Sequence, residues 1–270
     1  MTKATPAAPQ GPRILFIDIE TAPDVMWAWG VYEQSAIAVK EHWYVLSFAA
    51  KWRKGKAGGP IVTKGLDDYK GYTSGNSTER LLLQDVHTLL DEADIVVAHN
   101  GADFDVRKLN ARFIAHGMTP PSPYRVVDTK RDLARVAKFS SNRLNWLSKQ
   151  LGIGRKTMEH HDWKMWQGCM EGEAKCWRAM KTYNRHDVVL LQQLYEVLAP
   201  WIEQPNANVW STRPICPNPA CGHKRLHVAG TQPSKTRVYT RYRCPKCGSY
   251  ARSARSVRGT NITPTSRRYA

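Results

Sequence analysis

The sequence predicts an α/β fold followed by a small C-terminal module. From residue 13 to about 202, apolar runs of strand length alternate with amphipathic helical patterns, which is typical of a sheet covered by helices. After residue 203 the helical patterns stop, and four cysteines follow in two closely spaced pairs. We expect a loose arm over 1–12, a mixed five-stranded sheet with flanking helices over 13–202, a linker over 203–213, a cysteine module over 214–252 and a flexible basic tail over 253–270.

Five segments have the composition of strands, and the first three are close enough in sequence to form a meander. The expected strands are Arg13–Ile19, Tyr44–Trp52, Ile61–Lys64, DIVVAHN and YRVVDT. The Lys- and Gly-rich stretch KWRKGKAGGP between the second and third is typical of a hairpin turn. Helices are expected from Thr78 through LLLQDVHTLLDE and over Val106–His116, Thr129–Lys138, Asn142–Leu151 and Glu173–Leu198.

Charge is distributed unevenly along the chain. The 40 Lys and Arg and 23 Asp and Glu give a net charge of +17, and residues 204–270 hold 13 of the basic residues and no Asp or Glu. Such a segment attracts polyanions, of which nucleic acid is the commonest in cells, although an acidic protein partner or a solubility role would also fit. The chain has no run of about 18 apolar residues and no apolar signal region near its start, so we expect a cytoplasmic protein without membrane contact.

Acidic residues recur at the ends of apolar elements. Asp18 and Glu20 lie two apart at the end of the first strand, so both carboxylates project from one face, where a divalent cation would offset their repulsion. The alternative is a strand that runs out into solvent. Asp105 follows the Asn-Gly turn of AHNGADFD and either caps the next helix or faces a site. Tyr183 and Asp187 lie four apart on one face of the last helix.

In this order, the three motifs resemble the DEDD 3′-5′ exonucleases of the ribonuclease H-like fold. FIDIET resembles the first motif, HNGADFDVRKL the second and YNRHD the third, over about residues 13–202. Thr182 stands where one branch of the family has His, whereas Tyr183 is the residue of the tyrosine (DEDDy) branch, which includes proofreading domains of family A and B DNA polymerases. The second motif is most similar to the family B version. The resemblance implies a free-standing exonuclease or exonuclease subunit of a phage or bacterial type.

The resemblance also implies a mechanism that uses two Mg²⁺ or Mn²⁺ ions. Two such ions, about 3.5–4 Å apart, activate a water, neutralise transition-state charge and assist the departing 3′-oxygen. By resemblance, Asp18 would bridge both ions, Glu20 and Asp187 would complete the site of the attacking water, and Asp105 would support the second ion. Tyr183 would orient the water, because a phenol with a pKa of ~10 is a poor base at neutral pH.

The substrate expected for such a cleft is a frayed or single-stranded 3′ end, with DNA favoured over RNA. Trp27, Trp29 and Trp43 follow the first motif and could stack on the terminal bases, although core packing is the alternative for each. Replication, proofreading and repair are the expected settings, with a DNA polymerase or another replication protein as a partner. A non-catalytic nucleic-acid-binding protein and an endonuclease of the same fold remain as alternatives.

The C-terminal cysteines predict one Zn²⁺ in a zinc ribbon. Cys216 and Cys221 form a C-x4-C pair, and Cys244 and Cys247 form a C-x2-C pair in the zinc-knuckle string CPKCG. His223 is a possible substitute for Cys221. Cys169 and Cys176 are expected to be buried apolar residues, not ligands.

Basic and aromatic residues interleave between and after the cysteine pairs. This pattern predicts a module that holds nucleic acid, and a ribbon that docks onto a replication protein is the alternative. The candidate nucleic-acid-binding residues are Asn100, Arg237, Tyr239, Arg241, Tyr242 and Arg243.

Overall fold

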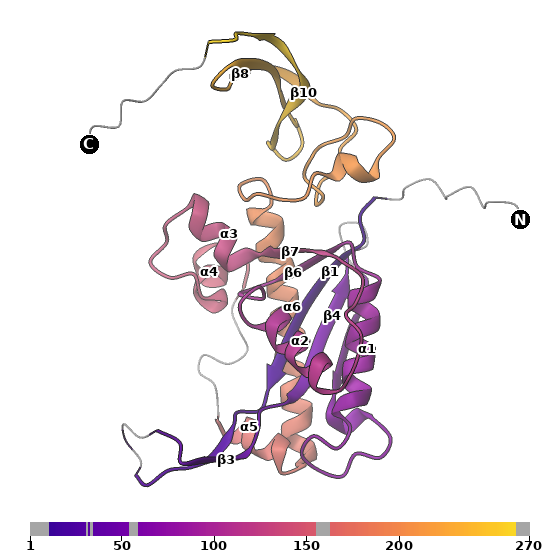
Figure 1. Cartoon of the computed structure of the whole chain (residues 1–270), viewed down its shortest axis with the longest axis vertical. Coiled ribbons are helices and arrows are strands. Elements are labelled where there is room, and N and C mark those ends of the chain that lie inside the picture. The colour runs from indigo at the N-terminus through magenta and orange to yellow at the C-terminus, as the bar shows by residue number, and fades with distance from the viewer. Residues whose placement is uncertain (1–10, 31, 33–34, 54–58, 155–162, 263–270) are drawn as a thin grey trace, which may run out of the picture. The chain divides into compact units, whose positions relative to one another are not determined.

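The computed structural model describes residues 11–30, 32, 35–53, 59–154 and 163–262. The chain forms two compact units, Arg13–Val197 and a C-terminal unit that begins at Leu198; both are drawn in Figure 1. No helix within the described residues combines the length and apolarity needed to cross a membrane.

The first unit is built on a mixed five-stranded sheet, as the sequence predicts. Its strands are β1 (Ile14–Thr21), β4 (Val45–Trp52), β5 (Ile61–Gly65), β6 (Ile95–Ala98) and β7 (Arg125–Asp128). Their spatial order is β5-β4-β1-β6-β7. The meander of β1, β4 and β5 is antiparallel, whereas β1, β6 and β7 are parallel. Strand β1 is therefore at the centre, with neighbours on both sides.

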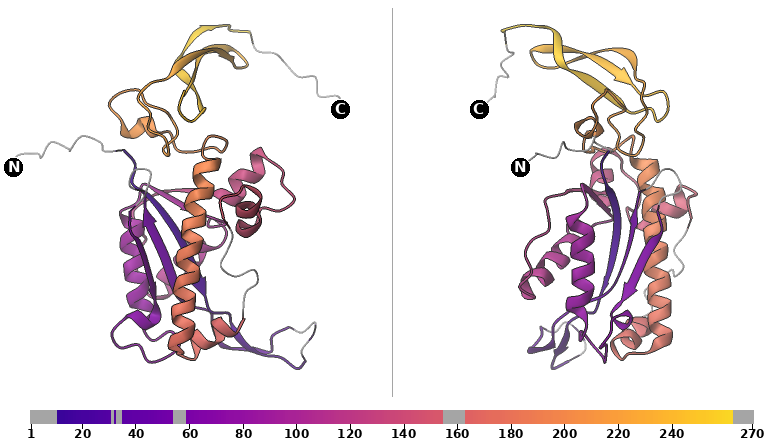
Figure 2. Two further views of the ribbon diagram at one scale, coloured as in Figure 1. Left: turned by 180° about the vertical axis from the view of Figure 1, so that it is seen from behind. Right: turned by 90° about the vertical axis from the view of Figure 1, so that its right-hand side faces the viewer.

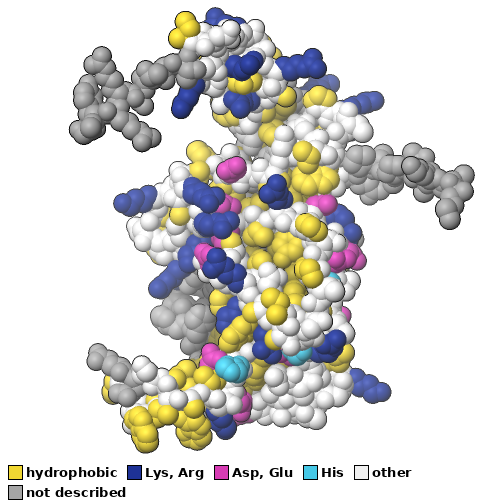
Figure 3. Space-filling model, viewed as in Figure 1, with side chains coloured by type: hydrophobic (Ala, Val, Ile, Leu, Met, Phe, Trp, Pro, Cys, Tyr) yellow, Lys and Arg dark blue, Asp and Glu magenta, His cyan; other side chains and the backbone are white. Residues whose placement is uncertain are grey.

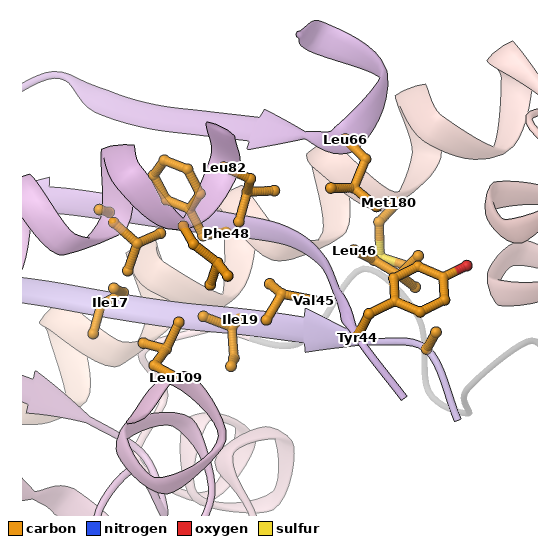
Figure 4. Close-up of a cluster of buried hydrophobic side chains, with 14 of the residues drawn as sticks. Ile17, Ile19, Tyr44, Val45, Leu46, Phe48, Leu66, Leu82, Leu109 and Met180 are labelled. Atoms are coloured by element: carbon orange, nitrogen blue, oxygen red, sulfur yellow. The ribbon is translucent and has the colours of Figure 1, made fainter. Parts of the chain in front are cut away.

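Helices cover both faces of this sheet. The helices are α1 (Glu79–Asp91), α2 (Asp105–Ala115), α3 (Thr129–Val136), α4 (Leu144–Gln150), α5 (Trp163–Met170) and α6 (Ala174–Leu198). The views in Figure 2 show α6 along one face and α1 and α2 along the other. Ile17 and Ile19 of β1 lie beside Leu109 of α2, as Figure 4 shows, whereas the ring of Phe16 meets that of Tyr195 on α6 at 5.5 Å between centroids.

Two strands and one α-helix of the first unit are not predicted by the sequence patterns. Strands β2 (Val25–Trp27) and β3 (Ala38–Glu41) pair as a separate hairpin, and α5 precedes α6. The hairpin strands are three and four residues long and largely exposed, so they carry no alternating apolar pattern. The expected turn between β4 and β5 includes residues 54–58, which lie outside the described part of the chain.

A buried ion pair ties the elements on the α1–α2 face together. The side chain of Glu79, at the start of α1, is fully buried and accepts a hydrogen bond from the backbone N–H of Val45 at 2.9 Å. Arg112 of α2 pairs with the same carboxylate through Nε at 2.8 Å and through Nη2, and His116 contacts it at 2.9 Å. Because the charge of Glu79 is paired and hydrogen-bonded, its burial is tolerated, and α1, α2 and β4 are fixed to one another.

The C-terminal unit contains an antiparallel three-stranded sheet of order β10-β9-β8, formed by β8 (His227–Pro233), β9 (Arg237–Arg243) and β10 (Tyr250–Gly259). The hairpin of β8 and β9 lies between the two cysteine pairs. Strand β10 continues to Gly259, beyond residue 252, because Ser256 and Gly259 still pair with β9. The segment expected as a linker contains the short helix η2 (Ala207–Trp210). Residues 263–270 of the expected tail lie outside the described part.

Candidate active site

Three of the predicted carboxylates meet at the end of β1. Asp18 and Glu20 project from β1 and Asp187 from α6, and one oxygen of each lies within 4.8 Å of the others. The residues paired with Asp18 and Glu20 on β4 are Ala49 and Ser47, so small side chains border the carboxylates on that face of the sheet. This geometry concentrates negative charge where α6 crosses the sheet, and such an oxygen donor set suits a hard divalent cation.

Asn184 fixes the orientation of Asp18, a role that the sequence analysis does not predict. Its side chain is fully buried, and its Nδ2 donates to Oδ2 of Asp18 at 2.6 Å and to the Asp18 carbonyl at 3.2 Å. The hydroxyl of Ser47 donates to Oδ1 of Asn184 at 3.4 Å. Asn184 lies three residues before Asp187 and therefore on the same face of the helix, which is the signal that could have identified it.

Asp105, the fourth predicted carboxylate, is held beside β1. It is the first residue of α2 and is buried, and its Oδ1 accepts a hydrogen bond from the backbone N–H of Ile19 at 3.1 Å. The three-carboxylate cluster does not include it, but Ile19 stands between Asp18 and Glu20 in β1. Burial raises the pKa of Asp105 to about 7, against the lowering effect of the hydrogen bond from Ile19.

The turn between β6 and α2 sets the position of Asp105. Asn100 adopts a left-handed φ of 71°, and a Cβ on Gly101 would lie 2.2 Å from the Cβ of Ala98, so glycine is required there. Buried Asp128 accepts hydrogen bonds from the N–H groups of Asn100 and Ala102, each at 3.0 Å, and also caps α3. The sequence analysis does not identify Asp128, although an Asp between a strand and a helix is a common N-cap signal.

Asn100 has a role within this turn. Its side-chain oxygen accepts a hydrogen bond from Nζ of Lys130 at 3.1 Å. The hydrogen bond from Lys130 and the left-handed backbone give Asn100 a structural role in the turn. Contact of Asn100 with nucleic acid stays a prediction.

Tyr183 lies in α6, one turn before Asp187, in the expected helix. Its ring is buried and meets Trp166 of α5 edge-on, with 5.9 Å between the centroids and 73° between the planes. The unpredicted helix α5 therefore restricts how the phenol can turn. The carboxylate cluster contains Asp187 and not the adjacent His186, in agreement with their positions on different faces of the helix.

Comparison with known proteins shows the family to which the chain belongs. A model of the RNase H superfamily matches residues 62–199, about half of the chain. The chain belongs to the RNase H superfamily. The matched stretch includes Asp105, Tyr183 and Asp187 and begins after Asp18 and Glu20, which the structure adds to the site.

Among solved structures, the chain is similar to a family B DNA polymerase from the hyperthermophilic archaeon Pyrobaculum calidifontis. The TM-score is 0.51 and the sequence identity 15%, with 70% of this chain and 25% of the polymerase covered. The chain thus spans about a quarter of the length of that polymerase, and the likeness shows a shared fold. A comparison with curated proteins finds no match.

Exposed aromatic residues follow β1 directly. Trp27 and Trp29 of the β2–β3 hairpin are 61% and 88% exposed, so neither packs in the core. Hydrophobic side chains gather at this end of the molecule in Figure 3. Trp43 is partly buried instead, and Nζ of Lys108 lies 3.7 Å from the centroid of its ring.

The four C-terminal cysteines form a second candidate metal centre. Their four Sγ atoms all lie within 4.8 Å of one another. The Sγ atoms of Cys216 and Cys247 are 3.5 Å apart, and those of Cys221 and Cys244 are 3.8 Å apart. Cys221 is part of this cluster, so His223 is not needed as a substitute. Four convergent thiols are a donor set that zinc prefers, because a cation removes the repulsion between thiolates. Cys169 is buried in the core of the RNase H unit, as expected, whereas Cys176 is only partly buried and packs against that core.

The predicted nucleic-acid-binding residues of the C-terminal unit lie on two faces of its sheet. Side chains alternate along a strand, so Arg237, Tyr239, Arg241 and Arg243 of β9 share one face. Tyr242 lies on the opposite face, where it pairs with Ala251 of β10 and Val228 of β8.

The buried carboxyl group of Asp105 predicts a pH-dependent stability. The pKa of about 7 in the folded chain exceeds the ordinary value of ~4 for an unfolded Asp, so the protonated group stabilises the fold below pH ~4, and this contribution is lost as the pH rises through 7. Without divalent cations, Asp105→Asn should therefore gain stability relative to the unmodified protein between pH 5 and pH 8, as measured by thermal unfolding. Asp103→Asn, at an exposed position in the same turn, should show no such gain. If the difference in stability between Asp105→Asn and the unmodified protein were the same at pH 5 and at pH 8, the prediction would be contradicted.

The cysteine cluster predicts one zinc ion for each chain. Elemental analysis of purified protein should find about one equivalent, and Cys247→Ser should lose most of it, because one of four thiolate ligands is removed. Cys176→Ser should keep the metal, because Cys176 is outside the cluster. Equal zinc contents in the two variants would show that the cluster is not the zinc site.

Proposed function

We propose that the chain is a metal-dependent 3′-5′ exonuclease that removes nucleotides from single-stranded or frayed ends, with DNA favoured over RNA. The observation that carries the proposal is the convergence of Asp18, Glu20 and Asp187 at the end of the central strand of an RNase H-like sheet. The motif resemblance to proofreading domains and the likeness to a family B DNA polymerase support the choice of an exonuclease. Replication, proofreading or repair is the setting we propose.

The donor set fits Mg²⁺ or Mn²⁺. Asp18, Glu20 and Asp187 would hold the ions. Burial raises the pKa of Asp105, and the positive charge of the ions would lower it again, so that Asp105 could contribute as a carboxylate. The bound ions would activate water and stabilise the charge that develops on the phosphate. Asn184 keeps the carboxylate of Asp18 turned toward the cluster, and Tyr183 would orient the attacking water.

The β2–β3 hairpin would bind the terminal nucleotides of the substrate. It leaves β1 immediately after Asp18 and Glu20, and it exposes Trp27 and Trp29. Aromatic rings stack on bases irrespective of sequence, as an exonuclease that removes successive nucleotides requires.

The test is a time course on 5′-labelled single-stranded DNA and RNA with Mg²⁺ or Mn²⁺. We expect a ladder that shortens from the 3′ end, faster on DNA. Asp18→Asn should lower the rate more than ~100-fold, because it removes a metal-binding charge while its amide oxygen can still accept from Asn184. Asp103→Asn, an exposed acid of the second motif, is the matched control and should retain activity. Tyr183→Phe should reduce the rate less than Asp18→Asn does, since it removes only a hydroxyl that orients water.

Other outcomes of this assay would contradict the proposal in distinct ways. Internal cuts in a circular single strand would indicate an endonuclease. Tight binding without cleavage under either metal would favour a non-catalytic nucleic-acid-binding protein. Equal and complete loss of activity in Tyr183→Phe and Asp18→Asn would contradict the role given to Tyr183.

The hairpin proposal predicts a selective defect. Trp27→Ala combined with Trp29→Ala should raise KM for an oligonucleotide at least ~30-fold, since stacking contributes ~1–3 kcal/mol per base and two rings are removed, and should leave hydrolysis of a nitrophenyl ester of thymidine monophosphate nearly unchanged. Trp201→Ala removes another Trp, 74% exposed, from the C-terminal unit and serves as the control. An equal loss of activity on both substrates would mean that the hairpin affects the carboxylate site and not the binding of the oligonucleotide.

A further inference from the structure

One face of the C-terminal sheet brings arginines and tyrosines together across two strands. The pairing of β9 and β10 places Tyr250 opposite Arg243 and Arg252 opposite Arg241, so these side chains share a face. We call this surface the arginine–tyrosine face, and it consists of Arg237, Tyr239, Arg241, Arg243, Tyr250 and Arg252. Tyr250 and Arg252 are additions to the residues predicted from the sequence, and Tyr242 is excluded by its place on the other face.

The side chains on this face are already interleaved. The guanidinium carbon of Arg252 lies 4.2 Å from the centroid of the Tyr239 ring. Those of Arg241 and Arg243 lie 5.6 Å and 5.8 Å from the centroid of the Tyr250 ring. Such cation–π contacts hold the arginines over the sheet and reduce the entropy that they would lose on binding a ligand.

The face is accessible and its charge is not balanced within its own unit. All four arginines are exposed, and Tyr250 is 58% exposed. Residues 204–270 contain no Asp or Glu, so the positive charge attracts an anionic ligand. An acidic peptide would satisfy the arginines alone, whereas a single strand of nucleic acid offers phosphates to the arginines and bases to the tyrosine rings.

We propose that the arginine–tyrosine face binds single-stranded nucleic acid without sequence preference. Its purpose, to retain the strand whose 3′ end the RNase H unit shortens, rests on the proposed exonuclease function. The binding itself does not depend on cleavage and can be measured separately.

The experiment measures binding of fluorescent oligo(dT) and oligo(U) by anisotropy, in the full chain carrying Asp18→Asn so that the strand is not cut. Arg252→Gln should weaken binding several-fold and make the slope of log Kd against log salt shallower by about 0.7, the value for one lost contact with a single-strand phosphate. Arg258→Gln is the matched control, because it removes the same charge from the same strand but pairs with Val238 on the opposite face. It should have little effect.

A second variant tests the tyrosines. Tyr250→Leu keeps an apolar side chain but removes the ring, and should weaken binding about 10-fold, within the ~1–3 kcal/mol expected for one stacked base. Val228→Ala, at a 69% exposed position on the opposite face, is its control. Zinc content, measured for each variant, excludes loss of the cysteine centre as the cause.

Three results would overturn the inference. Equal weakening by Arg252→Gln and Arg258→Gln would mean that total charge and not this face determines binding. Unchanged binding in Tyr250→Leu would exclude stacking, and competition by poly-glutamate as strong as that by oligo(dT) of equal charge would indicate an acidic protein ligand. If the face binds nucleic acid but the unmodified protein cuts no substrate, the exonuclease proposal is contradicted and the binding inference stands.

Discussion

The arrangement of the RNase H unit depends on placing three carboxylates at the end of a buried strand. Carboxylates within 4.8 Å of one another repel, and burial strengthens the repulsion because water screens it less. Hydrogen-bond donors counter this charge: Asn184 donates to Asp18, and the backbone of Ile19 donates to Asp105. The small residues Ala49 and Ser47 on the neighbouring strand border the same space. These hydrogen bonds reduce the cost of holding the carboxylates together, and a cation bound at the cluster would reduce it further.

Rigid support for these groups comes from elements that have no part in the chemistry. Asp128 holds the turn that leads to Asp105 through two backbone N–H groups, and it fixes α3 at the same time. Glu79 joins α1, α2 and β4 on the opposite face of the sheet from α6. Side chains that touch no substrate therefore determine how precisely the carboxylates are positioned, as expected for a site that relies on preorganised charge.

The sequence predicts those features that local patterns encode. Alternation along β1 predicts that Asp18 and Glu20 share a face, and helical spacing predicts the position of Asp187. Asn184 and Asp128 act through partners distant in the sequence, to which no local pattern points. The β2–β3 hairpin and α5 are not predicted because they are short: the hairpin strands are exposed and three and four residues long, and α5 spans only eight residues. In the C-terminal sheet, the composition identifies the basic and aromatic residues, but only the strand register separates Tyr242 from Tyr250.

In the proposed function, the charges of the two units would serve different parts of one substrate. A cluster of carboxylates repels phosphate until cations bind, so the site contributes little affinity for nucleic acid on its own. The C-terminal unit has the reverse composition, with basic residues and no Asp or Glu from residue 204 onward. In the proposed function, attraction of the strand and cleavage of its end are therefore assigned to different surfaces. This separation allows the carboxylate site to remain acidic enough to hold metal ions without making the whole protein repel its substrate.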